Sequence, residues 1–235
     1  MSEELKIQIL KETPTDSSEL NFKIIIIGDS FVGKSSLAIR ATRDTFEGQY
    51  HSTVGFEFMS FYARINDSII KLQIWDTCGQ EIYRSLISTF YRNSSLAIIV
   101  YSIDNKESFL NIDKWLNDIK TLGSPDVNIF LIGNKADLED EREVTKEMAS
   151  DFCASHGIMF NLETSAKTGF NAENVFTEAA KLLYMQHLNF RERSSRPYSL
   201  NNLRDKENSD YKIKLESTEE KEEENERPRK KRCCK

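Results

Sequence analysis

The sequence has few cysteines and no long apolar run. Its four cysteines include no C-x-x-C pair, which argues against a zinc site and against a disulfide framework. The first residues lack the apolar stretch of a signal peptide, and no segment is long and apolar enough to span a membrane. Ser2 stands where N-myristoylation needs glycine. These absences together predict a protein of a reducing, cytosolic compartment.

The charge is negative overall and uneven along the chain. A formal net charge of -6 argues against general nucleic-acid binding. Residues 191–235 nevertheless carry 14 Lys and Arg against 11 Asp and Glu. The length suits one domain with appendages. We expect a flexible extension at 1–20, a domain at 21–190 and a disordered tail at 191–235. Alternating apolar residues at 5–9 would also suit a short docked strand.

Strand and helix patterns alternate along the main domain. Short apolar runs predict strands at 22–27, 57–65, 69–76, 96–101, 127–132 and 159–164. Helical patterns follow at 36–41, 109–119, 144–152 and 175–183. The second and third strands are joined by a turn at 66–68 and form a hairpin. This order predicts an α/β fold with a doubly wound, mostly parallel sheet and one antiparallel edge strand.

Residues 28–35 read G-x-x-x-x-G-K-S, the phosphate-binding loop, between the first strand and the first helix. In that position backbone N–H groups and the positive end of the helix dipole meet phosphate oxygens. Lys34 would reach the β- and γ-phosphates, and the Ser35 hydroxyl would ligate Mg²⁺. The alternative is a chance glycine-rich turn, which the full spacing and the Lys-Ser pair disfavour.

Two later segments indicate that the base is guanine. Residues 134–137 read N-K-x-D and follow a predicted strand. The Asp137 carboxylate can accept two hydrogen bonds from guanine, whereas adenine offers no such donor pair. The Lys135 stem can lie along the base, and the Ala166 N–H can reach the guanine carbonyl. Alone, this tetrapeptide could be a polar turn. In order after a phosphate loop, and followed by Ser-Ala-Lys at 165–167, it indicates guanine-nucleotide binding.

Residues 75–81 read W-D-T-C-G-Q-E and close the returning strand of the hairpin. Asp76 is placed to bind Mg²⁺ through water. Gly79 would offer its N–H to the γ-phosphate, and Gln80 could orient the attacking water. Taken singly, Asp76 could be a strand-end turn residue and Gln80 an exposed polar side chain. As a set they indicate GTP hydrolysis.

With these motifs in order, residues 21–187 resemble the Ras-like small GTPases, a P-loop NTPase family. The Rab branch is the most similar, through residues 52–58, 71–77 and 90–93. The resemblance implies a GTPase domain with catalytic roles for Lys34, Thr53 and Gln80, and Mg²⁺ ligands Ser35, Thr53 and Asp76. It implies nucleotide contacts at Asp29, Ser30, Val32, Gly33, Lys34, Ser35, Ser36, Phe46, Tyr50, Thr53, Gly79, Asn134, Lys135, Asp137, Ser165, Ala166 and Lys167.

The resemblance also implies a GTP/GDP switch in vesicle traffic. Its hydrolysis would be slow and accelerated by a GTPase-activating protein. Further partners would be an exchange factor, effectors, a GDP dissociation inhibitor and a prenylation escort protein. Phe58, Trp75 and Phe90 would form an exposed effector-binding triad, unless they are core aromatics. Two departures from the family are Phe31, where a small residue is usual, and Ile82, where arginine is common.

The end of the sequence resembles a Rab tail. A C-a-a-X box is absent, but Cys233 and Cys234 stand beside a basic run at 227–232. Two geranylgeranyl groups and a basic patch would anchor the protein stably. We therefore expect it at the cytoplasmic face of endomembranes, with a cytosolic pool. The alternative is a pair of unmodified thiols and a cytosolic protein.

Two other functions are left open by the sequence. The chain could be a non-hydrolysing, GTP-bound membrane tether that binds effectors, which Gln80 and Thr53 disfavour. It could also be an ATP-using phosphotransferase, which the N-K-x-D segment disfavours.

Overall fold

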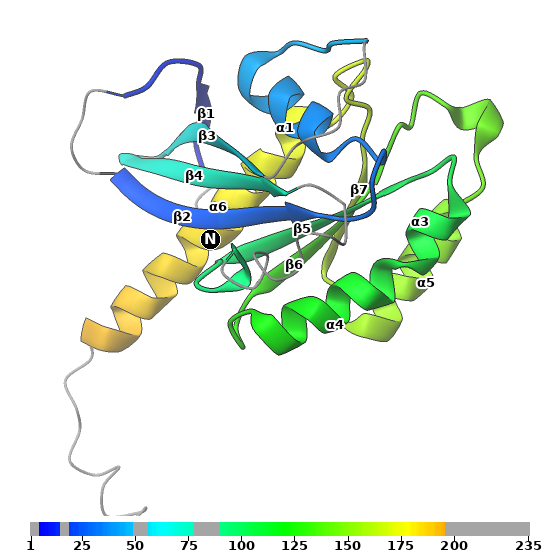
Figure 1. Ribbon diagram of the computed structural model, residues 1–235. Helices are drawn as coiled ribbons and strands as arrows, with labels where there is room; N and C mark the ends of the chain where they lie inside the picture. The colour runs from blue at the N-terminus through cyan, green and yellow to red at the C-terminus, as the bar shows by residue number, and fades with distance from the viewer. Residues whose placement is uncertain (1–4, 15–18, 49–55, 78–89, 196–235) are drawn as a thin grey trace, which may run out of the picture. The chain divides into compact units, whose positions relative to one another are not determined.

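The computed structural model describes residues 5–14, 19–48, 56–77 and 90–195 (Figure 1). The strands are β1 Ile7–Leu10, β2 Glu19–Ile27, β3 Phe56–Ile65, β4 Ser68–Thr77, β5 Leu96–Ser102, β6 Asn128–Asn134 and β7 Phe160–Glu163. The helices are α1 Lys34–Arg43, α3 Lys106–Leu110, α4 Ile112–Leu122, the 3₁₀ helix η2 Glu139–Glu141, α5 Lys146–His156 and α6 Ala172–Ser195.

The strands form one seven-stranded sheet in the order β1-β3-β4-β2-β5-β6-β7. From β4 to β7 every neighbouring pair is parallel, whereas β3 runs antiparallel to both β4 and β1. The predicted α/β fold with a mostly parallel sheet is therefore confirmed. The hairpin formed by β3 and β4 lies toward one edge of the sheet, as expected, but β1 adds a further strand outside it.

The strand β1 corrects the expectation that residues 1–20 are flexible throughout. It pairs with the end of β3, from Ile7 opposite Ile65 to Leu10 opposite Tyr62. The apolar residues of this segment pack on the core beneath: Leu5, Ile7 and Ile9. Main-chain pairing and apolar burial together hold these residues on the sheet.

The two faces of the sheet are covered by different helices (Figure 1). On one face Ile24 and Ile26 of β2 pack with residues of α1 and α6. On the other face Ile25 and Ile27 pack with residues of α3, α4 and α5. Because both faces are buried over residues 24–27, this half of β2 needs apolar residues at every position, which explains its unbroken run of isoleucines.

The helix ends follow local capping chemistry. The stripe expected to form one helix over 109–119 is split at Asn111 into α3 and α4. At α5 the Thr145 side chain accepts a hydrogen bond from the Met148 N–H at 3.2 Å, and Gly157 ends the helix with a φ of 68°. None of the helices in the described ranges has the length and apolarity to cross a bilayer.

Candidate functional site

The motif-bearing loops follow β2, β4, β6 and β7. These strands are mutually parallel, so their carboxyl ends meet at one edge of the sheet. In doubly wound folds ligands bind at this edge. The structure therefore places the phosphate loop and both predicted base-recognition segments at one end of the domain.

The phosphate loop is shaped by two close approaches. A Cβ on Gly28 would lie 2.1 Å from the carbonyl oxygen of Val100 in β5, and one on Gly33 would lie 2.3 Å from Nδ2 of Asn134. Both glycines also have positive φ angles, 137° and 91°. Gly33 precedes α1, and glycine has no side chain to cap the first N–H groups of that helix. Those groups form the anion-binding end of the helix.

The Lys34 ammonium lies inside the phosphate loop and is only 6% exposed. It donates to the carbonyl oxygens of Gly28 at 2.9 Å and Asp29 at 2.6 Å. The Asp29 carboxylate, in contrast, is turned to the other side. It accepts hydrogen bonds from Trp115 Nε1 at 2.8 Å and Asn111 Nδ2 at 2.6 Å. Asp29 thus fixes the loop to α4 and has its backbone, not its carboxylate, toward the phosphate site.

Asp76 at the end of β4 meets Ser35 at the start of α1. The Ser35 hydroxyl donates to Asp76 Oδ2. Asp76 is fully buried, and no described residue contacts its Oδ1 by a hydrogen bond. Burial raises the pKa of Asp76 to about 6, against the lowering effects of Ser35 and Lys34. A buried carboxylate with a free oxygen beside a hydroxyl is the donor chemistry that a hard divalent cation takes.

Asn134 joins the phosphate loop to the loop after β7. Its side chain is 1% exposed. Nδ2 donates to the Val32 carbonyl at 2.9 Å, while Oδ1 accepts from Thr164 Oγ1 at 3.1 Å and from the Ala166 N–H at 3.3 Å. The side chain is therefore engaged by protein groups on both sides. What the structure shows of Asn134 is that it holds the two loops together, and its predicted contact with the nucleotide stays a prediction.

Asp137 and its neighbours form the remainder of the base-recognition end. The carboxylate accepts a hydrogen bond from Ser165 Oγ at 2.5 Å and pairs with Lys167 Nζ at 3.6 Å. Lys135, with a φ of 63°, pairs with Asp104 at 3.4 Å. The carboxylate of Asp137 is thus oriented by two donors, as a group that must meet a planar ligand would be.

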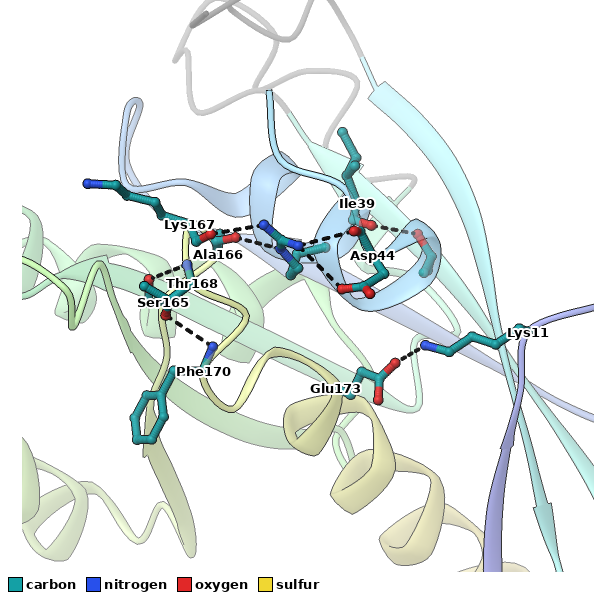
Figure 2. Close-up of polar contacts among 11 residues, drawn as sticks. Lys11, Ile39, Asp44, Ser165, Ala166, Lys167, Thr168, Phe170 and Glu173 are labelled. Carbon is teal, nitrogen blue, oxygen red and sulfur yellow. Dashed lines mark hydrogen bonds and ion pairs between the residues drawn. The ribbon is translucent and has the colours of Figure 1, made fainter. Parts of the chain in front are cut away.

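Arg40 of α1 supports the loop that follows β7 and was missed by sequence reasoning. Its Nε donates to the carbonyl of Ala166 at 2.8 Å, and its guanidinium reaches the carbonyl of Lys167 at 2.9 Å and Asp44 at 3.1 Å. Figure 2 shows Ala166, Lys167 and Asp44 around this guanidinium, with the Thr168 N–H donating to Ser165 Oγ and the Phe170 N–H donating to Thr168 Oγ1. No local sequence signal marks its role in this loop, because the acceptors there are the backbone carbonyls of Ala166 and Lys167, far along the chain.

Four aromatic rings meet where β3 and β4 pair. Trp75 lies 5.6 Å from Phe58 and 5.5 Å from Phe90, so the predicted triad is in contact. Phe56, which the sequence did not single out, lies 5.6 Å from Trp75 and 4.9 Å from Phe90. Phe56 and Phe58 are about half exposed, whereas Trp75 and Phe90 pack partly on the core. The cluster therefore has both an interior and a surface part.

The other predicted site residues divide into described and undescribed ones. Ser30 and Ser36 are half-buried in the phosphate loop and α1, and Phe46 after α1 is 39% exposed. Six lie outside the described residues: Tyr50, Thr53, Gly79, Gln80, Cys233 and Cys234.

Comparison with known proteins covers most of the chain. The family model described as "Ras family" matches residues 23–185. "Ras-related protein Rab5" of Nicotiana tabacum is 43% identical over 166 residues, which are 71% of this chain and 82% of the tobacco protein. "Ras-related protein RHN1" of Nicotiana plumbaginifolia is similar to the same extent, 43% over 166 residues with the same coverage.

Proposed function

The chain belongs to the Ras family of small GTPases and is of the Rab type, and from this premise we propose the roles of its individual residues. As a member it is a GTP-hydrolysing switch of vesicle traffic, which binds guanine nucleotide and acts through regulators and effectors. The predicted family, activity and general function are confirmed. The non-hydrolysing tether is not favoured.

The nucleotide contacts are proposed from the loops described above. The N–H groups of residues 29–36 and the Lys34 ammonium would bind the phosphates, since they surround the start of α1. Asp137 would accept two hydrogen bonds from guanine, and the Ala166 N–H would reach its carbonyl. Phe46 would stack on the base and Tyr50 would cover the phosphates, as in the family. The single observation that supports this assignment best is that Asn134 binds both loops at once.

Mg²⁺ fits the chemistry at Ser35 and Asp76, where a hydroxyl meets a buried carboxylate with an unpaired oxygen. Thr53 would complete the protein ligands. When bound, the ion would neutralise charge on the β- and γ-phosphates. Lys34 would hold the same oxygens from the opposite side of the loop. Gly79 would donate to the γ-phosphate, and Gln80 would orient the water that attacks it.

The tail and partners follow from the family. We propose that Cys233 and Cys234 are geranylgeranylated, so that the protein sits on the cytoplasmic face of endomembranes and has a cytosolic pool. An escort protein would present the chain for prenylation, and a GDP dissociation inhibitor would shield the lipids. An exchange factor and a GTPase-activating protein would drive the cycle. The rings of Phe58, Trp75 and Phe90 would bind effectors, because the half-exposed Phe58 ring lies in contact with Trp75 and continues the cluster to the surface.

Single-turnover hydrolysis tests the residue assignment. Purified full-length protein is loaded with GTP and Mg²⁺, and conversion to GDP is followed with time. We expect slow conversion that Gln80→Leu reduces at least tenfold, because a side chain that orients the attacking water is removed. Gln73→Leu, at a glutamine in the middle of β4, is the control. Equal rates in the two variants would contradict the role of Gln80, and retention of intact GTP by the unsubstituted protein would contradict the enzymatic assignment.

A further inference from the structure

One residue of the phosphate loop combines an unfavourable backbone with an exposed apolar side chain. Phe31 has a φ of 68°, in the left-handed region where a Cβ crowds the backbone and glycine is favoured. Its side chain is 63% exposed, so burial offsets little of that cost. Phe31 therefore costs the fold free energy, and strained residues of this kind are concentrated at functional sites.

The strained conformation is imposed by the residues on either side. The Asp29 carboxylate is held by Trp115 Nε1 at 2.8 Å, and the Val32 carbonyl is held by Asn134 Nδ2 at 2.9 Å. Phe31 lies between these two hydrogen bonds, whose donors are the buried side chains of Trp115 and Asn134. A change in the φ of Phe31 would move the chain between these two hydrogen bonds and strain them. The ring is consequently carried on a rigid segment and not on a mobile one.

We propose that the Phe31 ring is a steric barrier that slows the dissociation of bound guanine nucleotide. The inference rests on the proposed function, because it requires phosphates held by residues 28–35. Backbone N–H groups of that segment face the phosphates, and the same segment carries the ring at its surface. On this proposal, a leaving nucleotide would have to withdraw its phosphates past this ring. Phe31 would act by position alone and would take no part in hydrolysis.

Two substitutions separate the ring from the backbone. Phe31→Ala removes the ring and keeps a Cβ at positive φ, whereas Phe31→Gly removes the ring and also relieves the strain. Phe31→Leu keeps bulk at the position. Full-length proteins are loaded with fluorescent GDP at fixed Mg²⁺, and its release is followed after excess unlabelled GDP is added. We expect release about fivefold faster or more in both Ala and Gly variants, and a rate near that of the unsubstituted protein in Phe31→Leu.

Thermal unfolding at saturating GDP gives the second measurement. The Gly variant should unfold at a higher temperature than the Ala variant, although the two release GDP equally fast. Release that is as slow in both variants as in the unsubstituted protein would overturn the barrier. Fast release in the Ala variant alone would overturn it too, because backbone strain would then be the cause. If the unsubstituted protein retains no fluorescent GDP, the proposed function itself fails, and this outcome is distinct from the others.

Discussion

The two ends of the nucleotide site hold their charges in different ways. At the phosphate end Lys34 is 6% exposed and Asp76 is fully buried, and their partners are carbonyl oxygens and a hydroxyl. At the base end the side chains of Lys135 and Lys167 are 33% and 63% exposed, and each pairs with a carboxylate. The phosphate end is thus built into the interior of the domain, whereas the base end pairs nearly buried carboxylates, 18% exposed in Asp104 and 13% in Asp137, with lysines that reach the surface.

This difference predicts different consequences of mutation. A buried polar group that loses its partner costs the full desolvation free energy of what is left behind. An exposed ion pair contributes less than about 1 kcal/mol. Substitutions at the phosphate end should therefore disturb the fold or the cation, and substitutions at the base end should change nucleotide selectivity alone.

Asn134→Ala should have the largest effect, because Asn134 belongs to both ends. Without its amide, the Val32 carbonyl, the Thr164 hydroxyl and the Ala166 N–H each lose a hydrogen-bond partner. We expect a loss of about 3 kcal/mol in the free energy of unfolding. Urea unfolding at fixed nucleotide concentration measures this loss. Asn128→Ala is the matched control at the other end of β6, where the amide is half-buried and bonds Ser95. Equal losses in the two variants would break the distinction between interior and surface.

Asp137→Asn should weaken GDP binding about 100-fold, because an amide cannot accept both guanine N–H hydrogen bonds. The free energy of unfolding without nucleotide should fall by no more than about 1.5 kcal/mol, because the amide oxygen can still accept the hydrogen bond from Ser165 although the side chain is only 13% exposed. Competition between GDP and ADP for the site measures the selectivity. Asp140→Asn, at an exposed carboxylate of η2, should leave GDP affinity unchanged. A large loss of stability in Asp137→Asn would place the base end in the interior after all.

Asp76→Asn should raise the Mg²⁺ concentration needed to retain GDP about tenfold, since an amide supplies less negative charge to a cation. The Asn side chain can still accept the hydrogen bond from Ser35, so the fold should persist. GDP release is measured across a series of buffered Mg²⁺ concentrations and again after chelation. Asp67→Asn, in the exposed turn between β3 and β4, is the control. Release that depends on Mg²⁺ equally in both variants would remove Asp76 from the cation site.

Lys11→Ala should have the smallest effect. Lys11 pairs with Glu173 in the first turn of α6 (Figure 2), and their side chains are 55% and 39% exposed. A pair so exposed should contribute less than about 1 kcal/mol to the free energy of unfolding. Lys6→Ala, at a residue that contacts Asn66 through its backbone, is the control. The free energy of unfolding of both variants is measured in urea. A loss in Lys11→Ala that exceeds the loss in the control by about 1 kcal/mol or more, the upper limit for exposed pairs, would show that ion pairs, and not apolar packing, hold β1.

The sequence was sufficient for the elements that carry a strong local pattern. The structure has the predicted strand at the isoleucine run of β2 and the predicted hairpin of β3 and β4. The strand β1 was underestimated because its four residues form a strand only against β3, far along the chain. The break at Asn111 was missed because the apolar stripe continues across it from α3 into α4.

Motif spacing located the site but not the direction of every side chain. Asp29 lies in the phosphate motif, yet its carboxylate contacts Trp115, whose position depends on how α4 packs. Arg40 gave no signal because it binds backbone carbonyls. Phe56 joined the aromatic cluster through the pairing of β3 with β4, a tertiary contact that spacing alone does not specify.

The place of β1 in the sheet sets an order of assembly. Residues 7–10 are synthesised well before residues 62–65, with which they pair. The segment must therefore wait on the ribosome, without its partner, until β3 has emerged and closed a long loop. Between the emergence of β3 and the docking of β1, the outer edge of β3 has no strand beside it, and edges of this kind recruit other chains. Translation speed across α1 and β3 should thus govern how much newly made protein aggregates before β1 docks.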